Sequence, residues 1–234
     1  MSQVEFAGQV ALVTGASRGI GLEFVRQYRD AGARVIATAR DDVALARLRE
    51  LGAEPLRVDV ADPASISGLA WQLDGEKLDV ALYVAGVMNR ADARTPPTRE
   101  AFDALMHVNL LGAMQAIPQV APLVEAAATE HRLGRFAFIS SLMAQICAVP
   151  ASNAWLYRIS KAALNMAVAS ARHDYPRAIL AALSPGWVKT DMGGENAPVA
   201  LDDSVQAMRR TIDALTPERS GQFIDLEGHA FKGW

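Results

Sequence analysis

The chain has 234 residues, of which 51% are hydrophobic and 21% charged, and its formal net charge is −3. This length and composition predict one globular domain, residues 1–234, that buries a sizeable core. Because the sequence contains no basic block, we expect no nucleic-acid partner and no membrane contact.

Cysteine and histidine usage limits the chemistry further. Cys147 is the only cysteine, which excludes an intrachain disulfide, and the four histidines have no metal-ligand spacing, so no metal site is expected. Met1 to Phe6 has neither a basic nor an apolar leader pattern, and no apolar run approaches the roughly 18 residues of a membrane helix. These features predict a cytoplasmic protein in a reducing compartment.

Short aliphatic runs alternate with longer segments of helical periodicity. Near-continuous apolar runs such as Val10–Val13 suit strands covered on both faces, which favours a parallel sheet with right-handed crossovers. The expected fold class is α/β, a doubly wound Rossmann-type fold with a seven-stranded parallel sheet flanked by helices. The predicted strands are Gln9–Thr14, Arg34–Ala39, Pro55–Asp59, Val80–Ala85, Arg135–Ser140, Ala178–Leu183 and Gly221–Leu226. Because ligands bind such sheets beyond the carboxyl ends of the strands, the residues after each run are the candidates for a site.

A glycine-rich turn follows the first run and precedes an amphipathic helix that extends through Tyr28. Gly15, Gly19 and Gly21 permit a tight turn, and the start of the helix offers free N–H groups to a pyrophosphate. A packing turn between strand and helix would also use glycine, so this segment alone is a weak signal.

The spacing Gly-x-x-x-Gly-x-Gly resembles that of the short-chain dehydrogenase/reductase family. The resemblance covers essentially the whole chain and includes Ser141, the pair Tyr157-x-x-x-Lys161 and the Pro-Gly-Trp-Val-Lys-Thr-Asp-Met-Gly-Gly segment of residues 185–194. Within the family, the chain looks closest to the sniffer-like carbonyl reductases and the C-factor-like signalling proteins. The resemblance implies a nicotinamide dinucleotide cofactor and a small carbonyl or alcohol substrate.

The end of the second strand indicates which dinucleotide is bound. Ala37-Thr38-Ala39-Arg40 carries no carboxylate where an NAD-binding fold holds the adenosine ribose. Arg18 and Arg40 would instead bind a 2′-phosphate through forked, charge-assisted hydrogen bonds, so we predict NADP(H) in preference to NAD(H). Ordinary solvated roles for these arginines stay open. The other cofactor-binding residues that the resemblance implies are Gly15, Ser17, Gly19, Ile20, Gly21, Asp59, Val60, Ala85, Gly86, Tyr157, Lys161, Pro185, Gly186, Val188 and Thr190.

The resemblance assigns Asp59 to adenine; a helix cap is the alternative, although Asp62 before Pro63 fits that cap better. Val84 stands where the family usually has Asn, which puts a sheet-stabilising hydrogen bond in doubt.

Tyr157 and Lys161 are four residues apart on a predicted helix, so both side chains lie on one face. A tyrosine that exchanges a proton near neutral pH must titrate about three units below its usual pKa of about 10, and one nearby cation supplies roughly the 4 kcal/mol required. We therefore predict that Lys161, together with the charge of the nicotinamide, lowers the pKa of Tyr157. Alone, each residue would suit a half-buried aromatic and a solvated cation.

Ser141 follows the fifth run and would hydrogen-bond a substrate carbonyl. The family resemblance selects Ser141, and Ser140 stays open. The resemblance alone implies that Asn109 holds a water for proton relay to Lys161, and that Val188 and Thr190 hold the carboxamide side of the nicotinamide.

The sequence thus predicts an NADP(H)-dependent ketone or aldehyde reductase. The alternatives are an NAD(P)H-binding sensor or signalling protein with little turnover, and a scaffold that binds no nucleotide. The long segment from Arg99 to about Ala128 and the segment Trp155–Arg172 match helices that pair between subunits in the family, so a homodimer or homotetramer is expected. Whether residues 192–200 act as a lid is open. Six apolar residues near the site would line a substrate pocket or belong to the core: Met88, Leu142, Met143, Trp155, Trp187 and Met192.

Overall fold

The computed structural model of the chain describes residues 6–234, so the segment whose composition argued against a leader peptide lies outside that range except for Phe6. Seven parallel strands form one sheet in the order β3-β2-β1-β4-β5-β6-β7. The predicted seven-stranded Rossmann-type fold is confirmed. The strands are β1 Val10–Thr14, β2 Arg34–Ala39, β3 Glu54–Arg57, β4 Val80–Tyr83, β5 Gly134–Ile139, β6 Ala178–Ser184 and β7 Phe223–Asp225.

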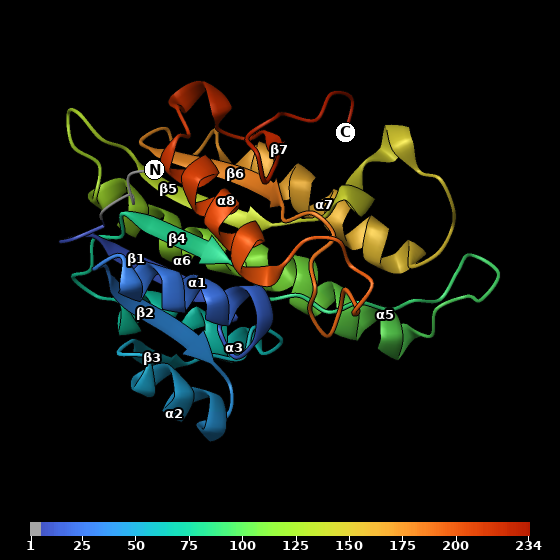
Figure 1. Cartoon of the computed structure of the whole chain (residues 1–234), viewed down its shortest axis with the longest axis horizontal. Helices are drawn as coiled ribbons and strands as arrows, with labels where there is room; N and C mark the ends of the chain where they lie inside the picture. Colours follow the sequence, from blue (N-terminus) through green and yellow to red (C-terminus); the bar gives the residue numbers. More distant parts are fainter. Residues whose placement is uncertain (1–5) are drawn as a thin grey trace.

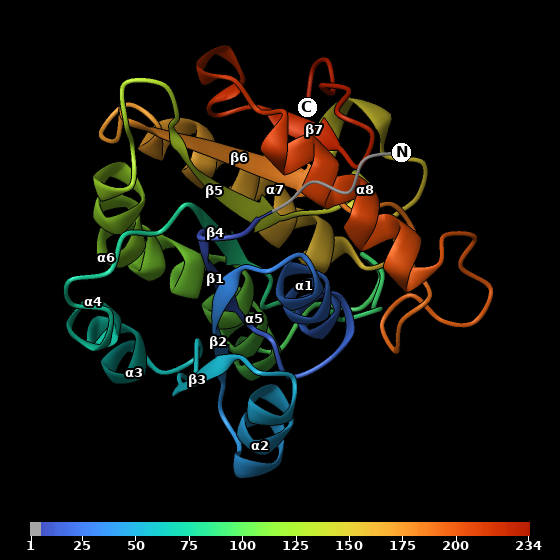
Figure 2. The same ribbon diagram turned by 60° about the vertical axis from the view of Figure 1, so that its left-hand side comes forward.

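Helices cover both faces of the sheet (Figures 1 and 2). On one face α1 packs against α8, and on the other α6 lies against α3, α4, α7 and strand β5. The helix α2 covers β2 and β3 at one edge of the sheet. The bounds are α1 Gly19–Asp30, α2 Asp42–Glu50, α3 Pro63–Ser67, α4 Leu69–Gln72, α5 Arg99–Met106, α6 Gly112–Ala126, α7 Trp155–Ala171 and α8 Leu201–Asp213. Short 3₁₀ turns span Leu142–Ala144, Ile146–Ala148 and Pro217–Arg219.

Alternate residues of each strand enter two separate hydrophobic cores. In β1, Val13 packs with α1 and α8, whereas its neighbour Leu12 packs with α3, α6 and α7. The same alternation places Val35 in the first core and Ile36 in the second. Because successive side chains of a strand point to opposite faces, strands buried on both sides need unbroken apolar runs, which is the pattern in the sequence.

The segment predicted as one long helix from Arg99 is divided. A π-helical turn, His107–Leu111, separates α5 from α6, and the Gly112 N–H donates to the His107 carbonyl five residues earlier. Such wide turns accommodate one extra residue and are frequent at functional sites. Here the turn places Asn109 fully in the interior.

Within residues 6–234, no helix combines the length and apolar character needed to cross a membrane. In the same part of the chain, no three His, Cys, Asp or Glu side chains gather in a way that would hold a metal ion.

Candidate active site

A cleft of about 1840 Å³ opens at the carboxyl ends of the strands. Its walls come from the segments after β1, β2, β3, β4, β5 and β6, together with the start of α7 and residues 185–195. Every residue predicted from the sequence to bind cofactor lines this cleft, as does Ser141. Asn109 lies behind its wall, fully buried.

The glycine-rich turn lets three backbone segments approach closely. Gly15 has a φ of +88°, and a Cβ there would lie 2.6 Å from the backbone nitrogen of Ala85. A Cβ on Gly21 would lie 2.2 Å from the Gly15 carbonyl oxygen. No side chain caps the N-terminus of α1, which begins at Gly19 and faces the cleft. An uncapped helix N-terminus beside a tight glycine turn fits the pyrophosphate of a dinucleotide.

Basic side chains lie at the end of the cleft beside β2. Arg40 follows β2 and has no ion-pair partner among residues 6–234, and Arg47 of α2, which the sequence analysis missed, lines the same end. Arg18 forms an ion pair with Asp191 at 2.5 Å, and both side chains are largely exposed. Such a pair contributes at most about 1 kcal/mol, so a phosphate group can displace Asp191 from Arg18.

The two carboxylates that follow Arg40 are both engaged. Asp41 caps α2 by accepting a hydrogen bond from the Ala44 N–H at 2.9 Å, and Asp42 pairs with Arg57. Asp41 lines the cleft with this cap in place, whereas Asp42 does not line it, and the preference for NADP(H) stays a prediction.

Asp59 and Val60 form the wall after β3. The Asp59 carboxylate accepts from the Ala61 N–H at 2.9 Å, whereas Asp62 caps α3 directly before Pro63. Asp62 is therefore the residue that caps α3, and Asp59 lines the cleft instead.

Val84 is held by its backbone and its packing. The N–H groups of Val84 and Ala85 both donate to the Thr14 carbonyl, at 2.9 and 3.2 Å, and the Val84 side chain packs against the core under α1 and α8. The link between β4 and β1 therefore persists without an asparagine at this position. Beyond it, a Cβ on Gly86 would lie 3.3 Å from Lys161 Nζ, so the glycine leaves the space above this lysine open.

Tyr157 and Lys161 lie one turn apart on α7 with 5% and 3% of their surfaces exposed. Lys161 Nζ donates to the Ile139 carbonyl at 2.7 Å and lies 5.9 Å from the centre of the Tyr157 ring. Burial lowers the pKa of Lys161 to about 8, because the charged ammonium is desolvated.

In the protein without cofactor, Lys161 by itself does not lower the pKa of Tyr157. Burial raises the pKa of Tyr157, and a hydrogen bond with Ser141 opposes that rise. The ammonium group is directed to the Ile139 carbonyl, so it does not offset the desolvation of the phenol. The predicted fall in this pKa depends on the positive charge of a bound nicotinamide as well, and it stays a prediction.

The two serines after β5 point in different directions. Ser140 donates to Asn165 Oδ1 at 2.6 Å in the interior. Ser141 lines the cleft, where its hydroxyl accepts from the Met143 N–H at 3.1 Å and interacts with Tyr157. The geometry therefore places the second serine, and not the first, beside the tyrosine.

Asn109 joins the β4 loop to α7. Its Oδ1 accepts from the Val87 N–H at 2.8 Å, and its Nδ2 donates to the Val87 carbonyl and to Ser160 Oγ, both at 2.9 Å. Ser160 in turn donates to the Tyr157 carbonyl at 2.7 Å. This fully bonded side chain fixes the position of the Tyr157 turn relative to the cleft floor.

Residues 185–194 close the cleft from the β6 side. The Pro185 carbonyl accepts from Ser204 Oγ of α8 at 2.7 Å, and Val188 pairs with Val199 in a short parallel bridge. Thr190 Oγ1 accepts from the Gly193 N–H at 3.0 Å. These bonds hold Val188 and Thr190 opposite the glycine-rich turn.

The apolar residues divide between pocket and core. Met88, Met143 and Met192 line the cleft and also pack around Tyr157, whereas Trp155 packs in that cluster without lining the cleft. Leu142 and Trp187 line the cleft and are 47% and 55% exposed.

Ala154, which the sequence analysis missed, is the one non-glycine residue among those described with a positive φ, +51°, and it directly precedes α7. Conformations of this kind concentrate at functional sites, and Ala154 lies three residues before Tyr157.

A family model described as short chain dehydrogenase matches residues 9–199. The chain belongs to the short-chain dehydrogenase family. It is 42% identical to C-signal of Myxococcus xanthus over 123 residues, which are 52% of this chain and 72% of C-signal. The carbonyl reductase Sniffer of D. melanogaster superposes with a TM-score of 0.86 at 24% identity, covering 97% of this chain and all of Sniffer, 100%. A short-chain dehydrogenase/reductase of Burkholderia multivorans with bound NADP gives a TM-score of 0.82 at 27% identity, covering 95% and 98% of the two chains. The predicted likeness to sniffer-like and C-factor-like members of the short-chain dehydrogenases is confirmed.

Proposed function

We propose that this short-chain dehydrogenase uses NADP(H) to interconvert a ketone or aldehyde and the corresponding alcohol. One observation carries the proposal: a single cleft joins an uncapped helix N-terminus and basic side chains at one end to the buried Tyr157–Lys161 pair and Ser141 at the other. The NADP-bound structure from Burkholderia multivorans supports the choice of cofactor.

Arg18 and Arg40 would bind the 2′-phosphate, and the N–H groups at the start of α1 would bind the pyrophosphate. Val188 and Thr190 would bind the carboxamide, while Lys161 is close enough to the floor at Gly86 to bind ribose hydroxyls. The bound nicotinamide would supply or accept the hydride.

The chain's own residues supply the proton that the substrate carbonyl oxygen takes up on reduction. Ser141 and Tyr157 hydroxyls donate to the substrate carbonyl oxygen, and Tyr157 gives up its proton as the alcohol forms. Lys161 is mostly protonated at pH 7 because its pKa is about 8, so its charge, together with that of the bound oxidised nicotinamide, would stabilise the phenolate that remains. Asn109 positions this unit through Val87 and Ser160.

We also propose that the protein acts as a homodimer or homotetramer. The outer faces of α5, α6 and α7 expose Phe102, Met114, Ile159 and Met166 between 43% and 62%, and neighbouring apolar side chains of this kind suit helix pairing between subunits.

Titration of the purified protein with NADPH and NADH, followed by nicotinamide fluorescence, tests the cofactor assignment. Addition of a mixed panel of apolar aldehydes and ketones to the tighter complex then tests turnover. We expect tighter binding of NADPH and its oxidation by members of the panel. Binding without oxidation across the panel would favour a sensor, and no binding of either nucleotide would favour a scaffold.

A further inference from the structure

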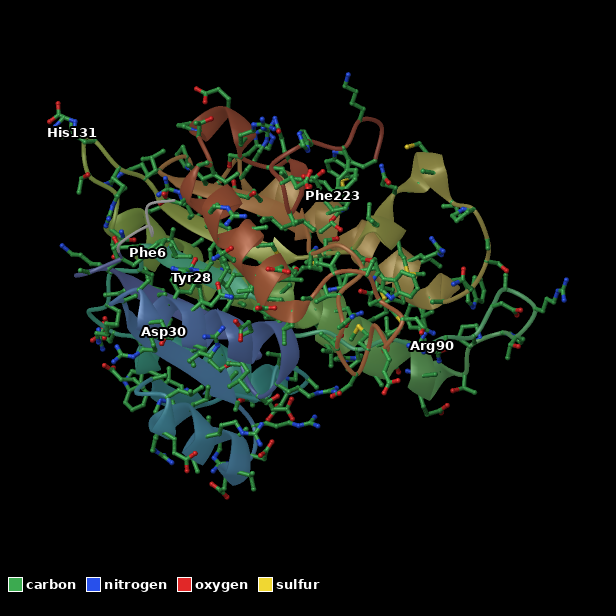
Figure 3. The ribbon with its side chains drawn as sticks, viewed as in Figure 1. Phe6, Tyr28, Asp30, Arg90, His131 and Phe223 are labelled. Atoms are coloured by element: carbon green, nitrogen blue, oxygen red, sulfur yellow. The ribbon has the colours of Figure 1, made fainter. Side chains whose placement is uncertain are left out.

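Two arginines, Arg90 and Arg158, line the cleft on the side where α7 begins. Arg90 lies in the loop after β4, and Figure 3 shows it where that loop leaves the body of the molecule. The loop is joined to α7 by the Trp155 N–H, which donates to the Ala91 carbonyl at 3.3 Å, and Arg158 follows in the first turn of that helix. Both arginines therefore stand on one rim of the cleft, next to Tyr157.

Each of these guanidinium groups is oriented by uncharged acceptors. Arg90 Nη2 donates to the Met192 carbonyl at 2.7 Å. Arg158 donates from Nε to the Asn153 carbonyl at 2.9 Å and from Nη2 to Asn153 Oδ1 at 3.0 Å. Neither arginine forms an ion pair with any residue between 6 and 234. The two guanidinium groups are therefore fixed in position without a carboxylate partner, and each keeps N–H donors that make no hydrogen bond within the described chain.

The carboxylates of the cleft do not neutralise this rim. Asp41 and Asp59 follow β2 and β3 at the other end of the cleft, and the charge of Asp191 is paired with that of Arg18. Of the acidic residues lining the cleft, Glu195 is the one whose carboxylate has no bond with the described part of the chain, and the exposed Lys189 lies on the same segment. The balance of charge at the rim is therefore positive.

An apolar wall connects the rim to the reacting hydroxyl. Met88, Met143 and Met192 pack around Tyr157 and line the cleft, and the backbone of Met192 is the group that Arg90 binds. Methionine side chains adapt to apolar ligands of varied shape, whereas planar guanidinium groups bind carboxylates by paired hydrogen bonds.

We infer that the substrate is an aldehyde or ketone with an apolar body and a carboxylate, which Arg90 and Arg158 bind while the carbonyl oxygen meets Ser141 and Tyr157. This inference rests on the proposed function and names the substrate class of the same site.

The test compares 4-carboxybenzaldehyde with its methyl ester, which share the aldehyde and the ring and differ in charge. Reduction by the NADPH complex is measured for the wild type, R90Q, R158Q and the double variant. R94Q is the matched control, because Arg94 is an exposed arginine of the same loop that does not line the cleft. We expect kcat/KM of the wild type to favour the acid, and the acid-to-ester ratio to fall about tenfold for each arginine removed, with no change in R94Q. An unchanged ratio in the double variant would overturn the inference.

A binding measurement separates failure of the inference from failure of the proposed function. Calorimetric titration of both compounds into the NADPH complex of Y157F should show the same preference for the acid. The preference should be lost in the triple variant that combines Y157F with R90Q and R158Q. Preferential binding of the acid without turnover by the wild type would refute the proposed reaction and leave the anion site standing. Turnover of both compounds with no arginine-dependent preference would refute the anion site alone.

Discussion

Replacement of Lys161 by Met should change how the stability of this short-chain dehydrogenase depends on pH. Lys161 is 3% exposed, and burial lowers its pKa from 10.5 to about 8. The folded state therefore binds the proton less tightly than the unfolded chain does. Below about pH 8 both states are protonated, and the folded protein bears the full cost of the buried charge.

The magnitude follows from the size of the shift. A change of about 2.5 pKa units corresponds to about 3 kcal/mol at 1.36 kcal/mol per unit. Between about pH 8 and 10.5 the unfolded chain holds the proton and the folded protein does not, so stability rises with pH in that window. From pH 7 to 10 the free energy of unfolding of the wild type should rise by about 2 to 3 kcal/mol relative to K161M.

Urea denaturation of the cofactor-free protein at several pH values between 7 and 10 measures this difference. K161M also leaves the Ile139 carbonyl without its hydrogen-bond donor, which lowers the free energy of unfolding of the variant by about 1 to 3 kcal/mol at every pH. The informative quantity is therefore how the difference in free energy of unfolding between wild type and variant changes with pH. Lys77 is exposed, and K77M should run parallel to the wild type. If the difference in free energy of unfolding between the wild type and K161M changes with pH as little as that between the wild type and K77M, Lys161 is not desolvated as described.

Three further predictions concern the frame of the site, the cofactor and the assembly. N109A removes three hydrogen bonds from a fully buried side chain and should lower the free energy of unfolding by about 3 kcal/mol in urea; a loss below about 1 kcal/mol would show that Asn109 does not hold the β4 loop to α7. R40A should weaken NADPH binding about tenfold and leave NADH binding unchanged in fluorescence titrations; an equal effect on both nucleotides would remove Arg40 from the 2′-phosphate site. M166E places a charge on a side chain that is 62% exposed on α7 and should give a smaller assembly than the wild type in size-exclusion chromatography with light scattering; equal masses would place the interface elsewhere.

The strands were predictable because apolar runs buried on both faces leave a direct record in the sequence. The Val10–Val13 run and the glycine turn after it gave the first βα unit and the edge at which the site lies. The bounds of the last strand were predicted less accurately: the prediction was Gly221–Leu226, whereas the strand spans Phe223–Asp225, the part that pairs with β6.

Other features left no local signal. The π-helical turn around Asn109 depends on tertiary contacts with Val87 and Ser160, and a continuous helix was the better prediction from periodicity alone. The positive φ of Ala154 was not predictable either, because alanine has no preference for that conformation.

Residue spacing predicted which groups share a helix face but not their environment. Tyr157 and Lys161 do lie together on α7, but spacing could not show that the lysine is directed to the Ile139 carbonyl or that burial raises the pKa of Tyr157 in the protein without cofactor. The choice between Ser140 and Ser141 also needed the structure, in which Asn165 holds Ser140 in the interior.

The central claim is that Tyr157 exchanges the proton with a carbonyl substrate. Its most direct test is the rate of NADPH oxidation by Y157F with an aldehyde that the wild type reduces, with NADPH binding measured in parallel. The account predicts that Y157F binds NADPH as the wild type does and that kcat falls by at least about a hundredfold. Near-wild-type turnover by Y157F would contradict it.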